Sequence, residues 1–77
     1  MDRTKIITRL GEGKPAIVPS TPFSISQLRS MARAAMRGST TLTIIIDPSH
    51  GLCDTDIDNI TDEAPANVVI DYSRLPL

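Results

Sequence analysis

Residues 24–38 (SISQLRSMARAAMRG) and 40–46 (TTLTIII) decide the fold, because a clearly marked helix is followed at once by a clearly marked strand. Ser24 and Gln27 have the spacing of a capping box, in which each side chain accepts a hydrogen bond from the other residue's backbone amide. Gly38 suits the left-handed residue that follows the last turn of many helices. Residues 40–46 are rich in β-branched side chains, which favour strands. The pattern predicts a helix that starts after Ser24 and a strand that follows Gly38.

Apolar side chains recur along one side of the predicted helix at intervals of three and four residues. Phe23 precedes the cap and is expected to pack on Leu28 as a hydrophobic staple. Met31 and Met36 are expected to widen the same apolar face. The helix is therefore expected to pack through this face.

A second helix and strand are predicted after the turn at residues 47–51 (DPSHG). Residues 54–64 have apolar side chains at helical spacing, and Asp54 suits the position that caps the first turn. Residues 67–72 alternate apolar and other side chains, as a strand does. The order of helix and strand is thus expected to repeat.

The N-terminal residues allow both a helix and a strand. Residues 1–10 contain threonine and isoleucine, which favour strands, but their apolar side chains also fit a short helix, and the helix is predicted. Gly11 and Gly13 are expected to end this helix. A short strand is predicted at residues 15–18, with Pro15 at the first position, where proline is tolerated.

The chain is therefore predicted to be one small α/β domain, residues 1–77, with helix-then-strand units at residues 2–18, 24–46 and 54–72. Strands joined by helical crossovers form parallel sheets. The prediction is a parallel sheet of two to three strands with helices packed on it, in the order α-β-α-β-α-β. Two arrangements stay open: a small open αβ layer, or the start of a solenoid in which each unit stacks on the next.

Two stretches, residues 42–52 and 68–75, resemble the strand-and-turn part of leucine-rich repeats. The resemblance covers under half of the chain. The regular asparagine and the fixed repeat length of that family are missing, so the chain is not assigned to it.

Small and aliphatic side chains must form the core, because the 77 residues include one Phe, one Tyr and no Trp. A chain of this length buries only about 60–65% of its unfolded surface, so help from a partner subunit is expected. The sequence has no run of 18 apolar residues and no signal peptide, so no membrane contact is expected. The single cysteine, Cys53, excludes an internal disulfide and favours a reducing, cytoplasmic location.

Charge is distributed very unevenly along the chain, although the formal net charge is only -1. Residues 1–37 contain seven basic and two acidic side chains, a net charge of +5. Residues 38–77 contain one basic and seven acidic side chains, a net charge of -6. Such asymmetry indicates either an interaction surface or two halves that neutralise each other when packed together.

Residues 11–14 (GEGK) look like the end of a phosphate-binding loop, in which backbone amides and a lysine hold a phosphate. That loop requires four residues between its glycines and a Ser or Thr after the lysine, and it connects a strand to a helix. Here one residue separates the glycines and Pro15 follows the lysine. A plain turn is predicted instead.

Two further motifs suggest metal or thiol chemistry. Asp54, Asp56 and Asp58 alternate as calcium ligands do, but other residues stand at the glycine and glutamate positions of a calcium loop. His50 and Cys53 can supply two of four zinc ligands, or a base and a thiolate. The other zinc ligands, a residue that orients the base and an oxyanion hole cannot be identified. The chain is therefore predicted to lack a metal, a cofactor and enzymatic activity.

Arg29, Arg33 and Arg37 are four residues apart and form a stripe along the central helix. Each guanidinium can bind a carboxylate or a phosphate with two hydrogen bonds. Nucleic acid is not expected, because the chain is acidic and has almost no aromatic side chains to stack on bases. A protein partner is expected, and the predicted interface consists of Arg29, Arg33, Arg37, Asp54, Asp56, Asp58, Asp62 and Glu63.

These features predict a non-enzymatic protein-interaction module that self-associates as a homo-oligomer or docks on a protein partner. If chain order follows spatial order, one end is basic and the other acidic, so copies are expected to meet head to tail. The alternative is a small regulator or inhibitor that binds a larger protein as a heteromer.

Overall fold

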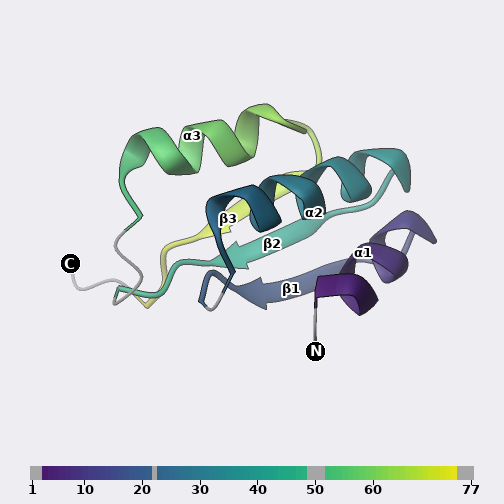
Figure 1. Ribbon diagram of the computed structural model, residues 1–77, viewed down its shortest axis with the longest axis horizontal. Coiled ribbons are helices and arrows are strands. Elements are labelled where there is room, and N and C mark those ends of the chain that lie inside the picture. The colour runs from purple at the N-terminus through teal and green to yellow at the C-terminus, as the bar shows by residue number, and fades with distance from the viewer. Residues whose placement is uncertain (1–2, 22, 49–51, 75–77) are drawn as a thin grey trace.

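Helices and strands alternate along the computed structural model, which describes residues 3–21, 23–48 and 52–74 (Figure 1). The elements are α1 (Arg3–Gly11), β1 (Ala16–Pro19), α2 (Ile25–Arg37), β2 (Leu42–Ile45), α3 (Asp54–Asp62) and β3 (Val68–Asp71). The predicted α/β order is confirmed, and the N-terminal segment is a helix, as predicted.

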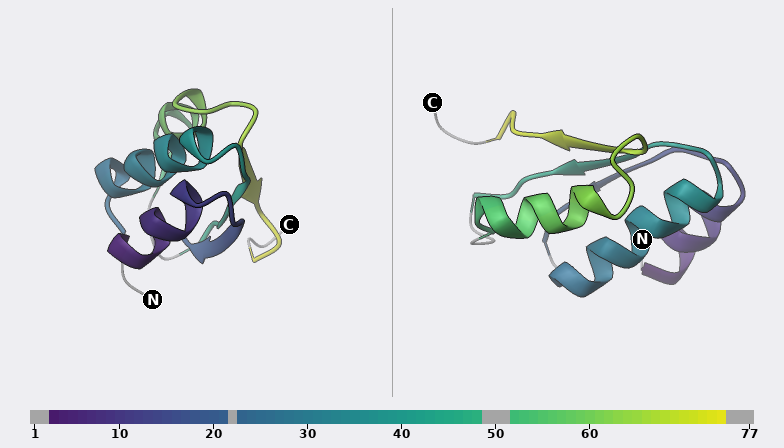
Figure 2. Two further views of the ribbon diagram at one scale, coloured as in Figure 1. Left: turned by 90° about the vertical axis from the view of Figure 1, so that its right-hand side faces the viewer. Right: turned by 90° about the horizontal axis from the view of Figure 1, so that it is seen from above.

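The three strands form one parallel sheet in the order β1-β2-β3. β2 and β3 therefore run parallel in the same sheet, as the predicted architecture requires. Figure 2 shows that the three helices lie in a layer on one face of the sheet and leave the other face uncovered. The structure is a two-layer α/β arrangement.

The strand register repeats with a fixed interval. Ala16 pairs with Leu42, and Leu42 pairs with Val68, so equivalent positions are 26 residues apart in both pairs. Helix order follows strand order as well, because α1 packs on α2 and α2 packs on α3. Each unit therefore stacks on the one before it, which is how the units of a solenoid are arranged.

The core lies between the sheet and the helix layer. Leu42 and Ile44 of β2 and Leu28 and Met31 of α2 are fully buried there. Ile17, Thr43 and Val69 occupy one row across the three strands in the register of the sheet. They lie on the uncovered face, because neighbouring residues of a strand point to opposite faces.

Two side chains tie the units together near the strand ends. Ser20 is fully buried, and its hydroxyl accepts a hydrogen bond from the Asp47 amide at 2.9 Å. At the opposite end, the side-chain amide of Asn67 donates to the Thr40 carbonyl at 2.8 Å. Each bond joins one unit to the next, so the stack is fixed by side chains as well as by the strand ladder.

The predicted start of α2 is confirmed. The Ser24 hydroxyl accepts from the Gln27 amide at 3.2 Å, and the Gln27 side chain accepts from the Ser24 amide at 2.9 Å. Phe23 and Leu28 are both buried in the core. Met36, in contrast, is 50% exposed, so its predicted place on the buried face is wrong.

The end of α2 differs from the prediction in the role of its glycine. Gly38 has φ -85°, and the left-handed residue is Ser39 with φ 53°. Glycine is needed at position 38 because a Cβ there would overlap the main-chain carbonyl of Leu10 at the end of α1. Gly38 thus allows α1 and α2 to approach closely.

The start of α3 also differs from the prediction. Cys53 is the cap residue, and Asp54 is the first residue of the helix. The carboxylate of Asp56 accepts from the Cys53 amide at 3.3 Å, so the negative charge at the helix N-terminus comes from inside the first turn.

Within the described residues, every helix falls short of the length and apolar character that a membrane crossing requires.

Candidate protein-interaction surface

Three residues of the predicted interface meet inside the chain. The Arg29 guanidinium donates from Nε to Glu63 Oε1 at 2.8 Å and from Nη2 to the same oxygen at 2.5 Å. Arg33 Nη1 donates to Glu63 Oε2 at 3.2 Å. These bonds join α2 to the end of α3. They account for part of the charge asymmetry by internal neutralisation.

The ion pairs also affect the protonation of Glu63. The hydrogen bond from Arg29 holds the pKa of the Glu63 carboxyl below its usual value, and the charges of Arg29 and Arg33 and the Arg33 hydrogen bond act in the same direction. The arginine side chains are 45% exposed, so solvent screens this interaction. A role for these three residues in binding another protein stays a prediction.

Arg37 is the third member of the arginine stripe and differs from the other two. It is exposed in the last turn of α2, and among the described residues it forms no ion pair. A role for Arg37 in binding another protein stays a prediction.

Three of the four aspartates of α3 form an acidic surface away from α2. Asp54, Asp58 and Asp62 are exposed. Asp54 and Asp58 are four residues apart, so they share one flank of the helix. At about 100° per residue, this flank lies roughly 140–180° from Glu63, which contacts α2. We call Asp54 and Asp58 the acidic flank. It faces the outer side of the stack.

Asp56 has a different environment from the other aspartates. Its carboxylate accepts from the Cys53 amide at 3.3 Å and from the Cys53 thiol at 3.2 Å. It is only partly exposed. Asp56 is therefore engaged at the start of its own helix.

The outer edge of β3 presents backbone groups that the sheet does not use. Leu42 donates to the Asn67 carbonyl at 2.8 Å, and Ile46 donates to the Asp71 carbonyl at 2.9 Å. Because backbone groups alternate in direction along a strand, the amides and carbonyls of Val68, Ile70 and Tyr72 point away from β2. Such an edge is a template for a further strand.

The outer edge of β1 is partly closed by proline. Ala16 donates to the Thr41 carbonyl at 3.1 Å and Ser20 donates to the Ile45 carbonyl at 2.8 Å, so Ile17 and Pro19 point outward. Pro19 has no amide proton, and this removes one donor from the edge. Ile17 keeps its outward amide and carbonyl.

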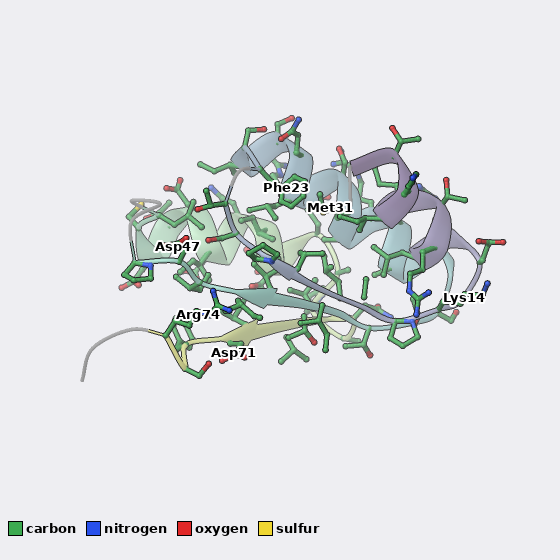
Figure 3. All side chains as sticks on the ribbon, turned by 90° about the horizontal axis from the view of Figure 1, so that it is seen from below. Lys14, Phe23, Met31, Asp47, Asp71 and Arg74 are labelled. Atoms are coloured by element: carbon green, nitrogen blue, oxygen red, sulfur yellow. The ribbon has the colours of Figure 1, made fainter. Side chains whose placement is uncertain are left out.

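A groove of about 660 Å³ runs beside the β1 edge, beneath α1. Its apolar walls come from α1, β1 and Phe23, which Figure 3 shows on the helix side of the sheet. Arg9 also lines the groove, and its Nε donates to the Pro15 carbonyl at 2.8 Å. The groove residues are Ile6, Arg9, Pro15, Ala16, Ile17, Val18, Pro19 and Phe23.

The Asp71 carboxylate forms a hydrogen bond with the chain just after β3. Its Oδ1 accepts from the Ser73 amide at 2.8 Å, and this bond lowers the pKa of the Asp71 carboxyl below its usual value. The charge of Arg74 acts in the same direction. Figure 3 shows both side chains near the end of β3. The turn after β3 is therefore held by a local carboxylate.

The weak ligand motifs have the following places. Gly11 ends α1, and residues 12–14 follow it as a turn in which Gly13 has φ 85°. A phosphate-binding loop lies before a helix, so the order of elements is the reverse of the one it needs. Cys53 is exposed, whereas His50 lies outside the described residues. Within the described ranges, no group of three His, Cys, Asp or Glu side chains is placed to hold a metal ion.

A parallel sheet of three strands is expected to have two open edges that can pair further, but no residue of these edges is among the predicted interface residues. Ile17 is 70% exposed and Val69 is 49% exposed, and both are large apolar side chains on edge strands. Pro15, just before β1, and Pro19, the last residue of β1, were the available signal, because proline is confined to edges and strand ends. The open β3 edge has no comparable signal in the sequence.

A search of protein-family models, curated proteins and solved structures finds no match to this chain, so no family is assigned to it.

Proposed function

We propose that the protein is a non-enzymatic protein-interaction module that self-associates, with copies meeting head to tail. The observation that carries this proposal is the difference between the two ends of the stack. The α3 end has an acidic flank next to an open strand edge, and the α1 end is basic. Opposite charges on two unlike ends favour contacts between one end and the other, which is a heterologous association.

The basic side of the proposed contact belongs to α1. This helix contains Lys5 and Arg9, four residues apart on one flank, and has no acidic residue in its sequence. We call Lys5 and Arg9 the basic flank. The arginines of α2 are less suited to this contact, because α2 lies between α1 and α3 in the helix layer (Figure 1).

The small core supports association in a second way. A single chain of 77 residues without Trp buries little apolar surface for its length. Stacked units gain stability from their interfaces with neighbours. Contacts between copies would therefore add to the stability of each copy.

Sedimentation at low and high salt tests the proposal. We expect the mean mass to exceed that of one chain at low salt and to fall as salt screens the flanks. Asp58→Lys and Lys5→Glu should each weaken association, and a mixture of the two variants should recover it. A monomer at high concentration in both salt conditions would contradict the proposal.

A heteromeric regulator is the second candidate, and Pro19 is the observation that favours it. With one donor missing from the β1 edge, the β3 edge is the more complete docking site, and a different protein can supply the added strand. A pull-down that yields a heteromer of defined stoichiometry, while the isolated chain stays monomeric, would favour this function over self-association.

A further inference from the structure

We infer that the head-to-tail contact is made by strand addition: the open edge of β3 pairs in parallel with the β1 edge of the next copy, in the same 26-residue register. This inference rests on the proposed self-association and names its geometry. It places Val68 opposite Ala16 of the next copy, because Ala16, Leu42 and Val68 are the equivalent positions within one chain.

The hydrogen-bonding groups of the two edges fit this register. The two existing ladders show the pattern, in which alternate residues of one strand donate to the next strand and accept from it. Applied to the junction, the amides of Val68, Ile70 and Tyr72 donate to the carbonyls of Pro15, Ile17 and Pro19 of the next copy. The Ile17 amide of that copy donates to the Val68 carbonyl.

Proline disturbs this ladder at one place only. Pro19 cannot donate to the Ile70 carbonyl of the preceding copy, which then stays available to water. The Pro15 carbonyl already accepts from Arg9 at 2.8 Å, but a carbonyl has two lone pairs and can accept a second bond. Pro19 therefore weakens the junction relative to the two internal ones without preventing it.

Two exposed apolar side chains support the same register. Ile17 and Val69 are the end members of one row on the uncovered face and are 70% and 49% exposed. In the inferred junction, Val69 lies beside Ile17 of the next copy, so each covers the other. A shift of two residues would place a proline beside Val69 instead, at position 15 or 19.

The groove beside β1 gives room for the side chains on the helix side of β3. Ile70 lies opposite Val18 of the next copy, and Val18 lines the groove. Tyr72, which is 49% exposed, follows Ile70 on the same side of the strand. The apolar groove is a suitable place for these two side chains.

The helix flanks complete the contact. In a continued stack, α1 of the next copy lies beside α3, as α2 lies beside α1 within the chain. The acidic flank, Asp54 and Asp58, then faces the basic flank, Lys5 and Arg9. The alternative of pairing two β3 edges antiparallel would place two acidic α3 helices side by side, and like charges oppose it.

Amide hydrogen exchange tests the inference directly. The amides of Val68, Ile70 and Tyr72 should exchange at least about tenfold more slowly at concentrations where sedimentation shows association. The amides of Val69 and Asp71 are the matched controls, because they point toward β2 in every state. If the chain associates but the three edge amides stay unprotected, strand addition is wrong and self-association stands. If the chain never associates, both proposals fall.

A disulfide test fixes the register. In a Cys53→Ser background, the double variant Ile17→Cys, Val69→Cys should form covalent multimers under mild oxidation, because neighbouring strands hold paired residues within disulfide distance. Thr43→Cys with Val69→Cys is the control, since these positions pair within one chain and should close internally. Far-ultraviolet circular dichroism confirms that each variant is folded. Multimers that form equally well from Pro19→Cys with Val69→Cys would overturn the register.

Discussion

The two junctions inside the stack are built differently. Where α1 meets α2, two main chains touch, because Gly38 lies against the Leu10 carbonyl. Where α2 meets α3, long side chains reach across, and Arg29 and Arg33 share the carboxylate of Glu63. The first junction depends on shape and the second on charge.

This difference bears on how a further unit is added. A shape-dependent junction tolerates almost no substitution but is insensitive to salt, whereas an exposed ion pair is weakened by salt and by low pH. The inferred junction between copies combines a strand ladder with charged flanks. We expect it to share the salt sensitivity of the α2–α3 junction.

The largest expected effect is the loss of the close approach at Gly38. Gly38→Ala should lower the free energy of unfolding by about 3 kcal/mol or more, because the added methyl group overlaps main-chain atoms that cannot rotate away. Chemical denaturation followed by circular dichroism measures this loss. It should be the same at low and high salt.

Gly11→Ala is the matched control for this substitution. Gly11 is the last residue of α1, and a Cβ there would have nothing within 4 Å. We expect a change within about 1 kcal/mol, and in the stabilising direction, since alanine reduces the freedom of the unfolded chain. Equal destabilisation by both variants would show that the close approach at Gly38 is unimportant.

An intermediate effect is expected at the starts of α2 and α3, because the two helices have different cap residues. Ser24 caps α2 with its hydroxyl, so Ser24→Ala should lower the free energy of unfolding by about 1 kcal/mol. Cys53 stands at the same position of α3, and Cys53→Ser should stabilise the protein, because serine is a preferred cap. Urea denaturation of both variants and the wild type measures the two shifts. Shifts of the same sign would contradict the comparison.

Local signals were sufficient to predict the fold, whereas the junctions depend on groups far apart in the sequence. The capping box at Ser24 and the β-branched run after Gly38 act over a few residues, so helix and strand order followed from them. The role of Gly38 could not be predicted from such local signals, because it is set by Leu10, a residue of another helix.

The candidate site was harder to predict for the same reason. Arg29 and Glu63 are 34 residues apart, and their pairing requires that α2 and α3 lie side by side. The outward amides of β3 depend on the phase of the ladder with β2, which a run of apolar residues does not specify. Charge asymmetry was visible in the sequence, but its division into internal pairs and outer flanks required the structure.

The smallest expected effect is that of Glu63→Gln, and its dependence on pH and salt identifies the α2–α3 junction. The pKa of Glu63 is lowered in the folded state, so the paired carboxylate stabilises the protein at pH values above its unfolded pKa. That contribution is lost as pH falls through the lower folded pKa.

At pH 7 and low salt, Glu63→Gln should lower Tm by no more than a few degrees, because the pair is exposed and screened. The gap in Tm between variant and wild type should close at high salt, and again once pH falls below the lowered folded pKa of Glu63, where both side chains are uncharged. Asp71, whose pKa is lowered by the Ser73 amide, is present in both proteins. Both should therefore lose stability in the same way as pH falls through the folded pKa of Asp71. Thermal denaturation across pH and salt measures the gap, and a gap that stays constant in both series would mean that Glu63 acts through packing instead of charge.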